Sequence, residues 1–188
     1  MPLDSPSQNM HMHGDNVLPS PEPLAYQDMA LQGVSRTFAL TIPQLPETLR
    51  AVVGNAYLLC RIADTIEDSP TLTAHDKRRY AEQFVAVVAG REAAEAFAVD
   101  LAPRLTDGVL EAERDLVAHT ATVVAITHSF PPEDRAALER CVRVMSEGMA
   151  RFQEGEFAHG LADQQQLDDY CYYVAGVVGE MLTDLFCL

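Results

Sequence analysis

The sequence has little positive charge. Its 188 residues hold 13 lysine and arginine residues, of which Lys77 is the single lysine, against 28 aspartate and glutamate residues. With a formal net charge of -15, the chain offers no basic stripe for a nucleic-acid backbone or an anionic membrane surface. We therefore exclude nucleic acid as a partner.

Cysteine motifs and long apolar runs are also missing. The four cysteines show no C-x-x-C spacing and are expected to be reduced core thiols: Cys60, Cys141, Cys171 and Cys187. No run approaches the roughly 18 apolar residues of a membrane span, and the N-terminus lacks the pattern of a signal peptide. These absences predict a cytoplasmic protein without a membrane span, at most peripheral to a membrane.

Helical patterning dominates what is present. Residues 1–23 are rich in Pro, Ser, Asn, Asp and Gly and predict a flexible leader, whereas 24–188 predict a single all-α domain or part of one. Pro and Gly breaks separate the expected helices, at about 25–34, 46–68, 74–89, 91–103, 109–128, 132–159 and 165–187.

An acidic cluster ends the helix expected over 46–68. Asp64, Glu67 and Asp68 share one face at spacings i, i+3 and i+4, where each like-charge pair costs roughly 0.2–0.5 kcal/mol. The helix macrodipole is negative at the same end. Mg²⁺ commonly bridges one or two carboxylates to substrate phosphates, so the cluster predicts a Mg²⁺-diphosphate site. The alternative is a solvated acidic helix end.

Three residues near this cluster are candidate phosphate ligands. Ser35 and Arg36 place a hydroxyl beside a guanidinium, a forked donor set for phosphate oxygens, although Ser35 would equally cap a helix. Arg61, one turn before Asp64, is expected to pair with that carboxylate or to reach a phosphate. A purely structural ion pair fits the spacing of Arg61 equally well.

The last expected helix carries an apolar stripe with phenol groups at one end. The stripe consists of Tyr170, Tyr173, Val174 and Val177. Gly176 and Gly179 would allow close approach of a helix or a ligand. Met145, Gly148 and Met149 on the preceding helix predict a wall against a long hydrocarbon, with core packing as the alternative.

Two motifs give the chain a family resemblance. Residues 34–39 and 57–68 resemble the first substrate-binding region and first aspartate-rich motif of the squalene/phytoene synthase family of head-to-head prenyl transferases. Residues 170–179 resemble its Y-C-x-Y-V-A-G-x-V-G signature, and 181–186 are nearer to the squalene branch than to the phytoene branch. The resemblance covers the chain from about Leu24 to the end.

The resemblance implies an all-α isoprenoid synthase fold around a central cavity. It implies condensation of two farnesyl diphosphates to presqualene diphosphate and reduction by NADPH to squalene, with phytoene or dehydrosqualene as alternative products. A second aspartate-rich motif would lie beyond Leu188, so the 188 residues are expected to be the front part of a longer enzyme, inactive alone. A protein that only sequesters a prenyl chain, without Mg²⁺, is the alternative from another class.

The resemblance also implies roles for single residues. Asp64, Glu67 and Asp68 would hold Mg²⁺, while Ser35, Arg36 and Arg61 would bind the diphosphate, and the two arginines also the nicotinamide cofactor. Catalysis would rest on Asp64, Asp68, Tyr57 and Tyr170, with Tyr170 moving the proton lost on cyclopropane closure. The rings of Phe38, Tyr57 and Tyr173 would face the allylic cation. The expected substrate pocket comprises Phe38, Met145, Gly148, Met149, Tyr173, Val174, Gly176 and Val177.

Overall fold

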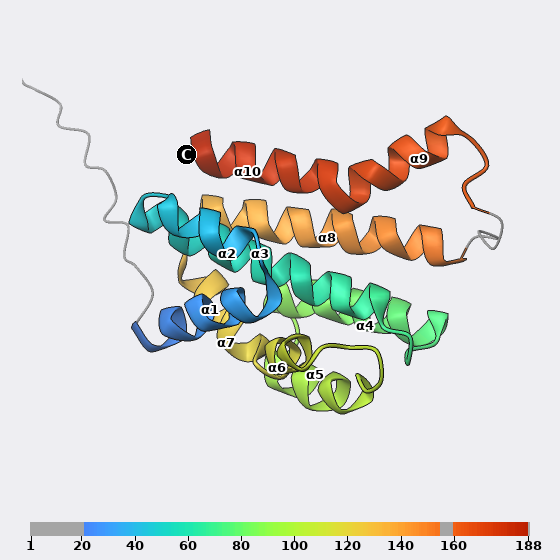
Figure 1. The fold of residues 1–188 in the computed structure, drawn as a ribbon, viewed down its shortest axis with the longest axis horizontal. Helices are drawn as coiled ribbons and strands as arrows, with labels where there is room; N and C mark the ends of the chain where they lie inside the picture. The colour runs from blue at the N-terminus through green and yellow to red at the C-terminus, as the bar shows by residue number, and fades with distance from the viewer. Residues whose placement is uncertain (1–20, 155–159, 188) are drawn as a thin grey trace, which may run out of the picture.

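The structure, a computed structural model, describes residues 21–154 and 160–187, and over these ranges it consists of helices joined by loops, without strands (Figure 1). The α-helices are α1 (Pro21–Val34), α2 (Phe38–Thr41), α3 (Glu47–Asp68), α4 (Ala74–Val88), α5 (Ala94–Leu101), α6 (Glu111–Ala118), α7 (Thr120–Ser129), α8 (Pro132–Glu154), α9 (Gln164–Cys171) and α10 (Val177–Cys187). Short 3-10 turns follow α2 and α5, and a π-helical turn, Tyr172–Gly176, joins α9 to α10. The all-α expectation is confirmed.

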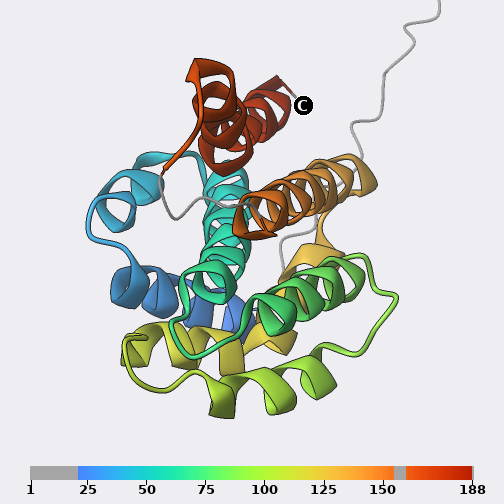
Figure 2. The same cartoon turned by 90° about the vertical axis from the view of Figure 1, so that its right-hand side faces the viewer.

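Helix α3 is the centre of the packing. It contacts α1, α4, α6, α7, α8 and α10, and Figure 2 shows it running between α1 on one side and α8 on the other. Two of its faces are apolar, so that residues from Ala51 to Ile66 are almost all buried. Because both ends of this helix are fixed by its neighbours, side chains on its last turns have defined positions.

A buried polar network ties α3 to α7 and α1. The Asn55 side chain donates to the carbonyl of Val123 at 3.0 Å and accepts from the Thr127 hydroxyl at 2.7 Å. Gln27 of α1 donates to the carbonyl of Ala51 at 2.9 Å, and a Cβ at Gly54 would lie 2.8 Å from its amide nitrogen. These bonds satisfy polar groups that would otherwise be costly to bury, and they set the register of α3 against its neighbours.

Several expected helix boundaries are wrong. Helix α1 begins at Pro21, so residues 21–23 belong to the fold and not to the predicted leader; residues 1–20 lie outside the described part. The helix expected over 109–128 is broken at His119. There the His119 ring bonds the Asp115 carbonyl at 2.8 Å and the Thr120 hydroxyl donates to the Val117 carbonyl at 2.7 Å, so side chains cap the end of α6.

The helix expected over 132–159 is present as α8 up to Glu154, and residues 155–159 lie outside the described part. The helix expected over 165–187 is interrupted by the π-helical turn, which rotates α10 relative to α9. Helix α5 begins three residues after the expected boundary, beyond Gly90, which has a φ of 69° and ends α4.

The cysteines divide into two classes. Cys60 on α3 and Cys141 on α8 are buried free thiols, as expected. Cys171 and Cys187 are exposed, so the expectation of four core thiols is wrong for these two. None of the described helices combines the length and apolar character needed to cross a membrane.

Gly148 marks the closest approach between α8 and the π-helical turn. A Cβ built at Gly148 would lie 2.1 Å from Cγ of Tyr173, whereas a Cβ at Gly179 on α10 would meet nothing within 4 Å. The absence of a side chain at Gly148 is therefore what admits the Tyr173 ring to this face of α8.

We predict opposite effects of alanine at these two glycines. Gly148→Ala forces the Tyr173 ring to move and should lower the free energy of unfolding by roughly 1–3 kcal/mol. Gly179→Ala, the matched control, should raise the free energy of unfolding by roughly 0.5–1 kcal/mol, because alanine favours helix without a clash. Urea unfolding followed by circular dichroism measures both, and a Gly148→Ala variant as stable as wild type would contradict the close approach.

Candidate functional site

The acidic end of α3 is partly buried. Helix α3 ends at Asp68, before Ser69 and Pro70, as the sequence predicts. Burial raises the pKa of Asp64 to about 6; the nearby Arg61 charge opposes this rise, while the charges of Asp68, Glu67 and Glu113 add to it. A carboxylate in this position is stabilised by any cation that can approach it.

Arg61 pairs with Glu113 of α6 and not with Asp64. Its Nη2 donates to Oε1 of Glu113, and the other oxygen of Glu113 accepts the backbone N–H of Leu110 at 3.3 Å. The expected pairing with Asp64 is wrong, because the guanidinium forms its ion pair with Glu113, a carboxylate from a helix distant in sequence. Nothing in the local spacing of α6 distinguishes Glu113 from an exposed glutamate, so the sequence analysis missed it.

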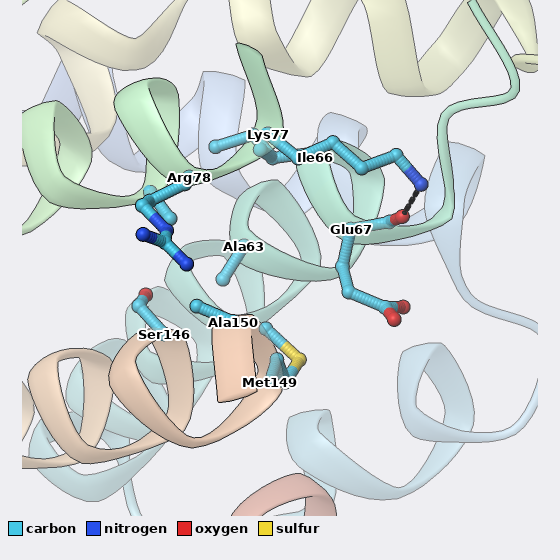
Figure 3. Close-up of a pocket in the computed structure, with 9 residues that line it drawn as sticks. Ala63, Ile66, Glu67, Lys77, Arg78, Ser146, Met149 and Ala150 are labelled. Atoms are coloured by element: carbon cyan, nitrogen blue, oxygen red, sulfur yellow. Dashed lines mark hydrogen bonds between the residues drawn. The ribbon is translucent and has the colours of Figure 1, made fainter. Parts of the chain in front are cut away.

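Lys77 caps the same end of α3. Its ammonium donates to the backbone carbonyl of Glu67, and Figure 3 shows the Glu67 carboxylate turned away from this contact. A cation at a helix C-terminus offsets the negative end of the macrodipole. The single lysine of the chain therefore stabilises the helix end at which the carboxylates crowd.

Tyr170 lies near this acidic end. Burial raises the pKa of its phenol, and the charges of Glu67, Asp68 and Asp64 raise that pKa further. Its ring packs edge-on against Phe152 of α8, with 5.3 Å between ring centroids. The structure thus brings the signature of residues 170–179 to the aspartate-rich end of α3, as both motifs were expected to share one site.

The segment between α1 and α3 carries the other expected diphosphate ligands. The Ser35 hydroxyl accepts the Phe38 N–H at 3.0 Å and so caps α2, which was the structural alternative for this residue. Arg36 is exposed. Tyr57 donates to the Val34 carbonyl at 3.3 Å, and its ring lies 5.2 Å from that of Phe38, which is 53% exposed.

Most of the expected hydrocarbon wall is core. Met145, Met149 and Val177 are buried, Gly148 is covered by Tyr173, and Val174 is half-buried, whereas Gly176 is exposed. The Tyr173 hydroxyl accepts from Arg151 at 3.0 Å. The alternative of core packing therefore describes Met145, Met149 and Val177 in this structure.

A small cavity lies on the α4 side of this wall (Figure 3). Its volume of about 10 Å³ suits a single water molecule and excludes a prenyl chain. Ser146 lines the cavity with a buried hydroxyl that has no hydrogen-bond partner among the described residues. A bound water is the simplest partner for this hydroxyl.

The acidic end fits a cation held by one or two carboxylates. Among the described residues, no three His, Cys, Asp or Glu side chains are placed so that they could hold one ion together. The three-ligand set of Asp64, Glu67 and Asp68 is therefore not preformed. Mg²⁺ commonly takes one or two carboxylates and completes its octahedron with waters and phosphates, and Asp64 and Asp68, one turn apart, offer this donor set.

We predict that Asp64→Asn stabilises the metal-free protein in a pH-dependent way. Because the pKa of Asp64 is raised on folding, its favourable contribution is complete below the unfolded value near 3.8 and is lost as the pH rises through about 6. The shift corresponds to about 3 kcal/mol at full burial, and solvent screening reduces this to about 1 kcal/mol.

Urea unfolding in the presence of a chelator measures the metal-free protein. The free energy of unfolding of Asp64→Asn should exceed that of wild type at pH 7.5 and equal it at pH 4. The exposed Asp28 of α1 provides the control, because Asp28→Asn should leave the free energy of unfolding nearly unchanged at both pH values. A lower stability of Asp64→Asn at pH 7.5 would mean that the ionised carboxylate is already satisfied by the protein.

Comparison with known proteins identifies the family. A family model described as squalene/phytoene synthase matches residues 31–188. The squalene synthase of Eremothecium gossypii is 33% identical over 160 residues, covering 84% of this chain and 34% of that protein. The squalene synthase of Solanum lycopersicum is 32% identical over 177 residues, covering 93% of this chain and 39% of that protein.

A solved structure of TcSQS with the ligand BPH1237 superposes with a TM-score of 0.73 at 27% identity, over 88% of this chain and 45% of that one. This match confirms the expected isoprenoid synthase type of all-α fold. The chain spans about a third of the length of the curated relatives it matches. Because the family model matches most of the chain, the chain belongs to the squalene/phytoene synthase family.

Proposed function

We propose that the protein acts as a squalene synthase, joining two farnesyl diphosphates head to head through presqualene diphosphate to squalene. The observation that carries the proposal is the meeting of Asp64, Arg61 and Tyr170 at the end of α3, in a chain of this family. The relatives cited above are named squalene synthases, and the prenyl diphosphate substrate is inferred from that family.

Diphosphate departure is the first step for which the residues are suited. Asp64 and Asp68 would hold Mg²⁺, which supplies positive charge for the leaving diphosphate when bound. Arg36 is exposed beside Ser35 and would donate to the phosphate oxygens. Burial, together with the charges of Asp68, Glu67 and Glu113, raises the pKa of Asp64 despite the opposing charge of Arg61, which suits a residue that awaits a further cation.

Aromatic residues on the α2 side of α3 suit the carbocation that remains. Phe38 and Tyr57 form a ring pair on the side of α2, and the face of an aromatic ring attracts a cation by roughly 0.5–2 kcal/mol. Tyr170 is a neutral phenol at neutral pH, and its raised pKa makes ionisation harder still. If Tyr170 takes the proton lost on cyclopropane closure, its own hydroxyl proton would pass to the departed diphosphate, which is a base in the same site.

NADPH would supply the hydride for the final reduction when bound. Of the two arginines proposed to contact it, Arg61 is engaged by Glu113, whereas Arg36 is exposed and presents a free face to a phosphate. We therefore propose Arg36 as the main contact of this segment with the cofactor. Phytoene and dehydrosqualene remain the competing products within the family, which includes both squalene and phytoene synthases.

The product that the full-length protein forms from farnesyl diphosphate tests the proposal. With Mg²⁺ and NADPH the expected product is squalene, and without NADPH presqualene diphosphate should accumulate. A chelator should abolish diphosphate release. Mass spectrometry of the extracted lipids identifies the product, and dehydrosqualene formed in the presence of NADPH, or phytoene formed from geranylgeranyl diphosphate, would assign the protein to the other branch.

We predict that Tyr170→Phe slows the first condensation on the order of a hundredfold, because it removes only the proton-transferring group. Tyr172→Phe is the matched control: Tyr172 is exposed on the next turn and its hydroxyl donates to Glu180 at 3.3 Å. Single-turnover formation of presqualene diphosphate should fall in the first variant and stay near wild type in the second. Equal rates in both would make Tyr170 a packing residue.

A further inference from the structure

The carboxylate of Glu113 is held from two sides. One oxygen accepts from Arg61 on α3, and the other accepts the backbone N–H of Leu110 at the start of its own helix. Glu113 is 9% exposed, so its carboxylate is desolvated and depends on these two donors. A carboxylate fixed in this way also fixes the guanidinium bound to it.

Arg61 has a competing partner on its own helix. Asp64 lies three residues further along α3, a spacing at which an arginine and an aspartate face each other. The ion pair recorded among the described residues nevertheless joins Arg61 to Glu113, and the Nε of Arg61 is buried without a partner. The guanidinium is therefore held against Glu113 of α6, and no hydrogen bond between Arg61 and Asp64 is recorded among the described residues.

The position of Arg61 decides what Asp64 can bind. A guanidinium seated on Asp64 would occupy the carboxylate oxygens by a bidentate contact and cancel the charge that attracts a metal ion. With Arg61 held by Glu113, the oxygens of Asp64 stay available.

We propose that Glu113 is a positioning residue: by holding Arg61 against α6, it keeps the guanidinium off Asp64 and so preserves the aspartate pair as a divalent-cation site. This inference rests on the proposed function, in which Asp64 and Asp68 hold the metal. Loss of the Glu113 charge should release Arg61, which then turns to the nearest carboxylate on α3.

Mn²⁺ binding to the full chain tests this inference without any turnover. Electron paramagnetic resonance measures free Mn²⁺, and the difference between wild type and Asp64→Asn isolates the site from other surface carboxylates. Glu113→Gln keeps the side-chain volume and one oxygen acceptor, and it should weaken Mn²⁺ binding about tenfold. Arg61→Gln should bind Mn²⁺ at least as tightly as wild type, because no guanidinium can then reach Asp64.

The double variant separates positioning from simple charge. If Glu113 acts through Arg61, Glu113→Gln should have no further effect on Mn²⁺ affinity in the Arg61→Gln background. An equal loss in both backgrounds would overturn the inference, because Glu113 would then act by its own charge. Glu113→Asp keeps the charge with a shorter reach and should give an intermediate loss, which provides a second test if Glu113→Gln does not fold.

Asp100→Asn is the matched control for breaking an ion pair. Asp100 pairs with Arg79 and Arg104, each at 3.2 Å, on the α4 and α5 side of the fold. This variant should leave Mn²⁺ affinity unchanged even if its thermal stability falls as far as that of Glu113→Gln. Wild type that binds no Mn²⁺ would overturn the metal assignment as well, whereas tight binding by both wild type and Glu113→Gln would overturn only the role of Glu113.

Discussion

Burial of α3 imposes an electrostatic constraint on every element that meets its C-terminal end. The helix is the centre of the core, yet its last turns carry three carboxylates at the negative end of its dipole. Two like charges 4 Å apart repel by about 4 kcal/mol at an effective dielectric constant of 20. Carboxylates that would cost little on a solvated helix therefore become a strong demand for positive charge.

The neighbouring helices meet this demand only in part. Lys77 of α4 donates to the backbone carbonyl of Glu67, which compensates the negative end of the helix dipole. Arg61 stands beside Asp64, but α6 supplies Glu113 and engages that charge. Helix α9 adds Tyr170, a neutral phenol. The positive charge thus lies around the aspartates without an ion pair to them being recorded among the described residues, as a site that binds an external cation would require.

The sequence predicted this site in its local parts and missed its long-range parts. The helical period and the Ser69–Pro70 break predicted the end of α3 correctly, because both signals are set by residues close together in the sequence. Glu113 and Lys77 could not be predicted to reach α3, since each has the spacing of an ordinary amphipathic helix. The break at His119 depends on side-chain bonds to backbone carbonyls that compete with helix continuation, and helical period does not detect these bonds.

The substrate wall was overestimated for a related reason. Methionine and glycine on α8 suggest a flexible surface, but whether they face a ligand or the core depends on which helix packs over them. The π-helical turn decides this by directing Tyr173 onto Gly148, a close approach that a 3.6-residue period does not anticipate. Recognising the motif located the segment correctly, whereas assigning each side chain to pocket or core required the packed structure.

A site with two carboxylates and no third protein ligand couples metal binding to substrate binding. Such a pair leaves most of the octahedral positions of Mg²⁺ to water and phosphate, so the ion is bound more tightly once a diphosphate is present. Arg61 and Arg36 favour the same anion and repel an isolated cation. Under the proposed function, cation and diphosphate would thus each strengthen the binding of the other, and full charge compensation at the end of α3 would be reached only with both in place.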